Sequence, residues 1–195
     1  MRSDRRKLLT LLTAGLLVGL VPGVGRGADP TPAQMRDALR KMRKETLDRL
    51  YRERPKLKAK LRGAAGYGVF SLEGFQLLFL GSSGGRGLVR DNLTGRDTYL
   101  RVASVGAGLG VGYRDQRLVL VFKSRDVLKR FVAEGWSFGS EGAAAAKAGN
   151  EGVADSGIQL ADGIEAFPLV ETGLIFTVTL QGYKYWPDEE LMDKR

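Results

Sequence analysis

The stretch from Ser104 to Phe122 constrains the fold most, because glycine occupies every second position through its first half. In an extended strand this period of two places all of these glycines on one face and the apolar residues between them on the other. Each glycine weakens a strand by about 0.5–1 kcal/mol relative to alanine, so a contact on the bare face must compensate. We predict that a helix, a crossing strand or a ligand chain packs against this face. The glycines are Gly106, Gly108, Gly110 and Gly112.

A second apolar run follows the glycine-rich one after a short polar segment, residues 114–116. The run from Leu118 to Phe122 is continuously apolar, which is typical of a strand buried on both faces. The polar segment between the two runs predicts a turn. We therefore expect residues 104–122 to form the central hairpin of the fold.

Two residue types are missing from the 195 residues: the chain contains no cysteine and no histidine. Disulfides, thiolate metal ligands and cysteine nucleophiles are therefore excluded, as are the commonest general base and the commonest transition-metal ligand. Carboxylate pairs such as Glu151 with Asp155 leave a hydrolase or a divalent-cation site as a remote alternative. We expect no catalytic residues, no metal and no cofactor.

The net charge of +9 is concentrated at the front of the chain. Residues 1–27 carry +4, residues 28–62 carry +7, and residues 63–195 carry −2. Residues 1–27 combine Arg5 and Arg6 with a modest apolar run and small residues, a pattern typical of an export signal and similar to the twin-arginine type. We expect a periplasmic protein cleaved near Gly27. The alternatives are an uncleaved anchor and a general secretory signal that carries two arginines.

Residues 28–62 predict a spacer and a basic amphipathic helix. Thr31 and Pro32 have the character of a cap and a first helical residue, and apolar residues recur at a three–four spacing over 33–54. One interpretation is a helix that covers the body and exposes its charges to solvent. The other is that its basic residues also bind an anionic lipid surface. The candidates for lipid contact are Arg36, Arg40, Arg43 and Lys44, together with the four glycines named above.

From residue 63 to residue 187 the pattern favours β-structure. We expect short strands at 67–70, 76–80, 88–90, 98–100, 136–140, 158–160, 166–170 and 174–180, with a helix at 125–133 capped by Ser124. Residues 91–95 are expected to form the turn of a hairpin between the strands 88–90 and 98–100. The glycine-rich segment 81–87 is expected to be a loop, and it lacks the pattern of a phosphate-binding loop. Neither a nucleotide nor a nucleic acid is therefore an expected partner. Residues 188–195 are expected to form an acidic mobile tail.

Several motifs occur in a characteristic order. They are AGYGVF at 65–70, GGRGLV at 84–89, SVGAGLGVG at 104–112, LVLVF at 118–122, the Gly/Ala-rich tract 139–149 and GLIF at 173–176. In this order, from about Leu61 to Trp186, the chain resembles the SYLF-domain family of lipid-binding proteins. The resemblance implies a mostly antiparallel β domain with flanking helices, no catalytic machinery and a role in binding membrane lipids, which are phosphoinositides in eukaryotic members.

The expected fold is therefore α+β: a single, mostly antiparallel β domain with a bent, barrel-like sheet, an N-terminal amphipathic helix and short flanking helices. The expected function is non-enzymatic, peripheral binding of phospholipid or another anionic lipid at a bacterial envelope membrane. The alternative is a structural or protein-interaction component of the cell envelope that has no lipid ligand and whose protein partner is unknown. The lipid head group, the oligomeric state and the physiological process stay open.

Overall fold

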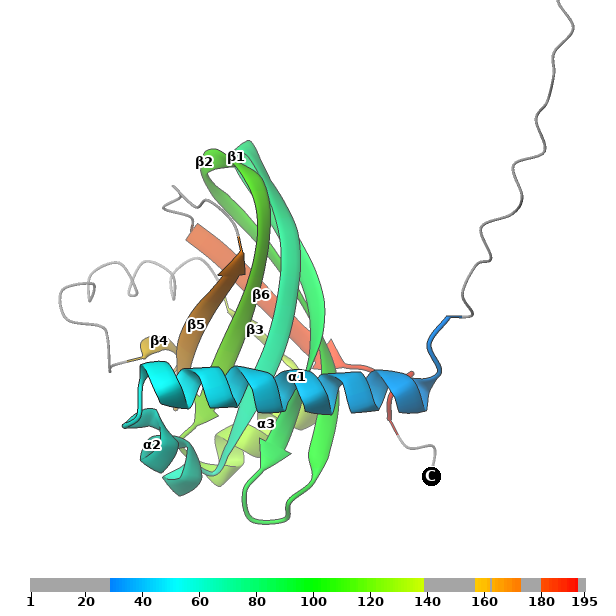
Figure 1. The fold of residues 1–195 in the computed structure, drawn as a ribbon, viewed down its shortest axis with the longest axis vertical. Helices are drawn as coiled ribbons and strands as arrows, with labels where there is room; N and C mark the ends of the chain where they lie inside the picture. Colours follow the sequence, from blue (N-terminus) through cyan, green and yellow to red (C-terminus); the bar gives the residue numbers. More distant parts are fainter. Residues whose placement is uncertain (1–28, 139–156, 162, 173–179, 193–195) are drawn as a thin grey trace, which may run out of the picture.

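The computed structural model describes residues 29–138, 157–161, 163–172 and 180–192. Within these ranges the chain forms one α+β domain, in which a mostly antiparallel sheet curls into a half-barrel flanked by helices (Figure 1). The fold class predicted from the sequence is confirmed. The helices are α1 (Pro32–Glu53), α2 (Leu57–Gly63) and α3 (Arg125–Glu134). The strands are β1 (Gly66–Asp91), β2 (Asp97–Phe122), β3 (Trp136–Phe138), β4 (Ile158–Ala161), β5 (Ile164–Thr172) and β6 (Leu180–Pro187).

Two 26-residue strands, β1 and β2, form a long antiparallel ribbon that organises the sheet. The register shifts once, between Leu78 and Leu80, and the ribbon folds back at its upper end in Figure 1. The first half of β2 pairs with β6 over residues 100–107, and its second half pairs with β5 over residues 115–122. The two halves of β2 therefore border different parts of the sheet. The first half lies beside β6 and β3, and the second half lies beside β5 and β4.

The predicted central hairpin is wrong, because residues 114–116 continue the strand instead of turning. Asp115 pairs in register with Glu73 of β1 and with Thr172 of β5, and Gln116 is buried. The Asp115 carboxylate is paired within the sheet, since Arg117 Nη1 donates to Asp115 Oδ1 at 2.5 Å and to the Ser71 hydroxyl at 2.7 Å. The expected loop 81–87 is also strand. The hairpin predicted from the strands 88–90 and 98–100, with its turn at 91–95, is confirmed, since the turn lies at residues 92–96.

Glycines allow the two arms of β1 to cross at close range. A Cβ atom built on Gly85 would overlap the carbonyl oxygen of Ser71, and one on Gly87 would overlap the carbonyl oxygen of Val69. Gly74 lies in the same way against Ser82. No larger residue fits at these positions without moving a backbone, so glycine is what lets the ribbon fold back on itself.

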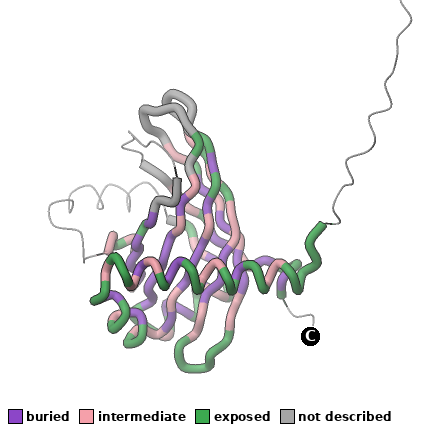
Figure 2. Tube along the Cα trace, viewed as in Figure 1, coloured by how far each residue is buried: buried purple, intermediate pink, exposed green. Residues whose placement is uncertain are grey.

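The helices cover the two faces of the curled sheet. On one face α1 and α2 bury Leu47, Leu50, Leu57 and Leu61 against a cluster that includes Val119, Val121, Phe167 and Leu169. On the other face Phe131 of α3 packs in a cluster with Phe70, Leu120, Phe122 and Tyr185. The run 118–122 is therefore buried on both faces, as predicted. Figure 2 shows exposed residues along the outer side of α1, where it crosses the sheet.

The predicted helix signals are confirmed. The Thr31 side chain accepts from the backbone N–H of Gln34, whose side chain accepts from the Thr31 N–H, and Pro32 occupies the first turn. Ser124 caps α3, which ends at Gly135 with a φ of 73°. Several predictions fall outside the described residues. They are the export signal 1–27, the Gly/Ala-rich tract 139–149 and most of the strand predicted at 174–180.

The first residues of the expected mobile tail pack against the body instead. Asp188 is 1% exposed and its backbone N–H donates to the Tyr99 carbonyl oxygen at 3.0 Å. Leu191 is buried in a cluster with Leu39 of α1 and Leu88 of β1. The segment after β6 thus links α1 to the ribbon, because one apolar side chain and one buried carboxylate hold it there.

Candidate functional site

The folded end of the ribbon, called the tip here and formed by residues 74–85 and 102–113, contains no charged residue. The strand register sets these two segments opposite each other, with Phe75 across from Tyr113 and Gly85 across from Val102. Charge resumes at both ends of the tip, at Glu73, Arg114 and Asp115 on one arm and at Arg86 and Arg101 on the other. These 24 uncharged residues with charged borders therefore form one end of the domain.

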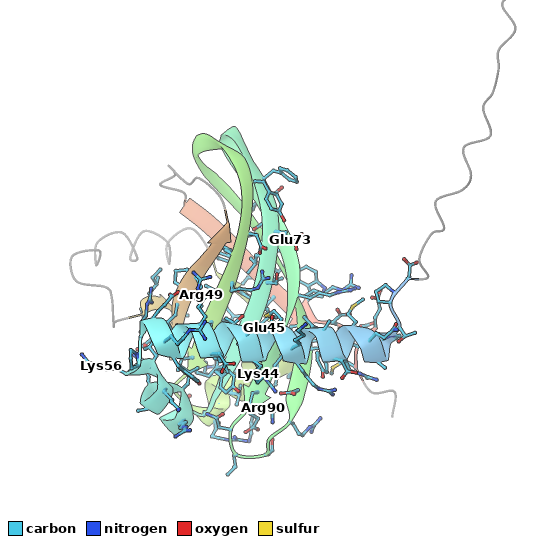
Figure 3. All side chains as sticks on the ribbon, viewed as in Figure 1. Lys44, Glu45, Arg49, Lys56, Glu73 and Arg90 are labelled. Carbon is cyan, nitrogen blue, oxygen red and sulfur yellow. The ribbon has the colours of Figure 1, made fainter. Side chains whose placement is uncertain are left out.

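Large apolar side chains are exposed on this tip. Phe75 is 70% exposed, Val105 is 70% exposed and Tyr113 is 45% exposed. The rings of Phe75 and Tyr113 lie 5.4 Å apart between centroids, so they form one aromatic surface. Figure 3 shows Glu73 on β1 between α1 and the folded end of the ribbon. Exposed apolar surface gathered at one place marks an interaction site more often than single exposed residues do.

The predicted glycine candidates lie in this tip. Gly106 pairs with Gly81, Gly110 with Leu78, and Gly112 with Gln76 in the antiparallel register. Gly108 belongs to β2 close to the register shift of β1. The structure does not describe the side chains of residues 107–112. The predicted contact of a helix, strand or ligand with the glycine face therefore stays a prediction.

The predicted basic candidates lie on α1, and the structure does not bring them together with the tip. Arg43 is 17% exposed and its Nη1 donates to Asp97 Oδ1 at 2.8 Å. Arg36 Nη1 donates to the Leu191 carbonyl oxygen at 3.3 Å. Arg40 pairs with Asp37 at 2.8 Å. The three arginines therefore hold the helix in place or pair along it.

Lys44, the fourth basic candidate, lies on the outer side of α1 (Figure 3). Its side chain is 78% exposed and its Nζ lies 3.1 Å from Asp48 Oδ2. Lys41 is equally exposed at 77% and lies 3.9 Å from Glu45 Oε1. Such exposed pairs between neighbouring turns are weak, so both lysines are available to an outside anion.

Asp97 is the carboxylate that fixes α1 to the ribbon. Its side chain is 10% exposed and accepts from Arg43 of α1 and from Arg90 Nη2 of β1, at 2.8 Å and 2.9 Å. Two guanidinium groups on different elements thus share one nearly buried carboxylate. Charge-assisted hydrogen bonds of this kind are among the stronger polar contacts in proteins.

A second charged cluster, formed by Arg86, Arg101, Asp188 and Glu190, lies where the tip ends. Arg86 and Arg101 face each other across β1 and β2, and their Nε atoms lie 2.9 Å and 3.3 Å from the oxygens of buried Asp188. The Nη2 atoms of both arginines lie 2.7 Å from one oxygen of Glu190. The hydrogen bond that Arg101 donates to the Glu190 carboxylate is the main reason that the pKa of Arg101 is raised above its ordinary value.

This cluster borders a cavity of about 590 Å³. Arg86, Arg101 and Trp186 line it together with Ser71 and Glu73, so both signs of charge occur on its wall.

Elsewhere, Glu165 pairs with Lys60 and Lys123. Burial raises the pKa of Glu165, but the hydrogen bonds from the two lysines outweigh burial and lower it overall.

Across the described ranges, no group of three acidic residues is placed to hold a metal ion. The helices described here include none with the length and apolarity needed to cross a membrane.

Sequence reasoning missed the site formed by Phe75, Tyr113, Arg86 and Arg101. It assigned residues 81–87 to a loop and residues 114–116 to a turn, so the two uncharged segments were never aligned. The signal that finds them is the absence of charge over 74–85 and over 102–113. The sequence shows two uncharged segments of equal length with charged borders. The strand register then places them opposite each other in one ribbon.

The fold and the site define an α+β domain built on a folded β ribbon with an uncharged tip. No family model matches the chain. The chain is 30% identical over 164 residues, or 84% of its length, to a curated homologue from Aeromonas veronii named beta cell expansion factor A. The match covers 61% of that protein, so this chain spans less than two thirds of its relative's length.

Proposed function

We propose that this protein is a non-enzymatic lipid-binding domain that contacts a bacterial envelope membrane peripherally, through the tip of its β1–β2 ribbon. The observation that carries the proposal is the exposed aromatic and apolar surface on a tip without charged residues. Phospholipid or another anionic lipid is the ligand class. The order of motifs that resembles the SYLF-domain family supports the same function.

The energetics favour insertion of the tip into an apolar layer. Full burial of a side chain such as Phe75 is worth about 1.5–3 kcal/mol, and Val105 and Tyr113 add to this. No charged residue lies in the tip itself, so the charges near the lipid are those at its borders, where Glu73 interacts with Tyr113. The charged residues at its borders are suited to the headgroup layer.

The tip and the outer side of α1 are separate contact surfaces. The helix packs on Val69 of β1, and Phe75 lies six positions farther along the strand, roughly 20 Å at about 3.3 Å per residue. Charges more than about 8–10 Å from a membrane surface are largely screened at physiological salt. In a tip-first contact, Lys41 and Lys44 therefore contribute little. In a helix-first contact they dominate.

Co-sedimentation of the full chain with phospholipid vesicles tests the proposal. Phe75→Ser combined with Tyr113→Ser is expected to weaken binding tenfold or more, since it removes the aromatic surface. The matched control is Leu93→Ser, because Leu93 is 77% exposed and lies in the hairpin turn at the opposite end of the ribbon. The control is expected to bind as the unsubstituted chain does.

Charge reversal on α1 separates the two contact modes. Lys41→Glu with Lys44→Glu leaves the Asp97 network intact and is expected to change vesicle binding less than threefold at physiological salt. A large loss with these variants and none with the tip variants would relocate the contact to the helix. Absence of vesicle binding at low salt for the unsubstituted chain would reject lipid binding and favour the envelope-structural alternative.

A further inference from the structure

The paired arginines at the border of the tip are arranged around an oxyanion position. Arg86 and Arg101 are directly opposite each other in the register, and two like charges in this position destabilise a strand pair unless an anion lies between them. Asp188, whose side chain is fully buried, lies 2.9 Å and 3.3 Å from their Nε atoms and so forms an ion pair with both arginines. Their Nη2 atoms are left to converge on a second anion.

In this structure the carboxylate of Glu190 fills that second position. Its Oε2 lies 2.7 Å from Arg86 Nη2 and 2.7 Å from Arg101 Nη2. The Glu190 side chain is 63% exposed, in contrast to the fully buried Asp188. An exposed carboxylate is weakly held, whereas the two arginines beneath it are fixed. Glu190 therefore has the properties of an internal occupant that an external anion displaces.

The place of the pair in the fold points to the source of that anion. Arg86 follows Leu80 at the register shift by six residues, roughly 20 Å of strand at about 3.3 Å per residue. One leaflet of a bilayer has roughly 15 Å of hydrocarbon, half of the ~30 Å core. With the tip inserted, the two arginines reach the level of the lipid phosphates. The placement of the two arginines at the lipid phosphates rests on the proposed function, whereas their binding of an anion does not.

We propose that Arg86 and Arg101 form a clamp for a phosphate-type oxyanion, with Glu190 as its displaceable internal occupant and Asp188 as its positioning residue. Guanidinium groups match phosphate geometry and bind it with charge-assisted hydrogen bonds. The adjoining cavity of about 590 Å³ has room for the group that carries the phosphate. Glu73 on the cavity wall confines the anion to the arginine side.

Calorimetric titration of the full chain with inorganic phosphate, in chloride buffer of constant ionic strength, tests the clamp. Glu190→Gln removes the internal occupant and is expected to raise phosphate affinity about tenfold. Glu189→Gln, an equal loss of charge at the neighbouring exposed residue, is expected to raise it less than twofold. Equal effects of the two variants, or no phosphate binding by Glu190→Gln, would overturn the proposal.

A second variant keeps the test independent of folding. Arg101→Lys retains a positive charge beside Asp188 but cannot also supply the second donor to the anion. In the Glu190→Gln background it is expected to lower phosphate affinity about tenfold, with an unchanged circular dichroism spectrum. Unchanged affinity would show that the anion binds elsewhere and would overturn the clamp.

Two further arms identify the source of the phosphate. If the source is a lipid headgroup, Glu190→Gln strengthens binding to phosphatidic acid vesicles more than to phosphatidylcholine vesicles. If the source is soluble, glycerol 1-phosphate binds Glu190→Gln as tightly as inorganic phosphate, and the vesicle preference is absent. If the tip variants bind vesicles as tightly as the unsubstituted chain, only the membrane contact of the tip is rejected. Phosphate binding by the clamp is measured separately, because the calorimetric titration contains no lipid.

Discussion

Gly85 crosses Ser71 at so short a distance that a Cβ atom on Gly85 would occupy the place of the Ser71 carbonyl oxygen. Gly85→Ala is therefore expected to lower the free energy of unfolding by about 1–3 kcal/mol, as overpacking in a core does. Urea denaturation followed by circular dichroism measures this. The control is Gly84→Ala, because the nearest atom to a Cβ there is 3.8 Å away. A control loss as large as that of Gly85→Ala would contradict the crossing.

The absence of cysteine makes the tip easy to probe with a single label. Val105→Cys carrying an environment-sensitive fluorophore is expected to show a blue-shifted, stronger emission with anionic vesicles, because the label enters an apolar layer. Leu93→Cys with the same label, at the hairpin turn, is expected to show no shift. Equal shifts at both positions would argue against a tip-first orientation.

Among the carboxylates on the α1 side of the domain, neutralising Asp97 is expected to lower the free energy of unfolding most. Asp97→Asn leaves Arg43 and Arg90 without their shared anion, and its side chain is only 10% exposed. Loss of a buried partner costs about 3–5 kcal/mol, which we discount to about 1–3 kcal/mol because both arginines reach solvent. Chemical denaturation gives the value. Asp48→Asn, in an exposed pair with Lys44, should cost under about 0.5 kcal/mol.

Asp91 at the hairpin turn gives a pH dependence of stability. Two hydrogen bonds from Arg125, at 2.6 Å and 3.0 Å, are the main reason that the pKa of Asp91 lies well below its ordinary value of 3.8. Ionised Asp91 therefore stabilises the fold fully above about pH 4, and this contribution is lost as the pH falls toward the lowered pKa.

Asp91→Asn tests this contribution. At pH 7 it is expected to lower the free energy of unfolding by about 1 kcal/mol, a value reduced because the Arg125 side chain is 35% exposed. The difference from the unsubstituted chain should stay constant from pH 7 to pH 5 and shrink below pH 4. A difference that grows in acid would contradict the assignment. Denaturant titrations at several pH values measure it, with Asp48→Asn as the control.

Local elements are predictable from the sequence where their signals lie close together in the chain. Thr31 and Ser124 cap their helices because each contacts a backbone N–H only three residues away. The burial of 118–122 on both faces is likewise predictable, since a continuously apolar run is typical of a strand that is covered on both faces. The α+β fold class followed from the same local patterns.

Tertiary contacts settle whether residues 114–116 turn and which charges are paired. Residues 114–116 have the composition of a turn, yet they extend along β1 and β5, because cross-strand pairing outweighs a local preference. Arg43 has the composition of a solvated helix face, yet Asp97, 54 residues away, holds it. The meeting of Arg86, Arg101 and Glu190 likewise depends on strand register and on the packing of Leu191, which no local sequence pattern contains.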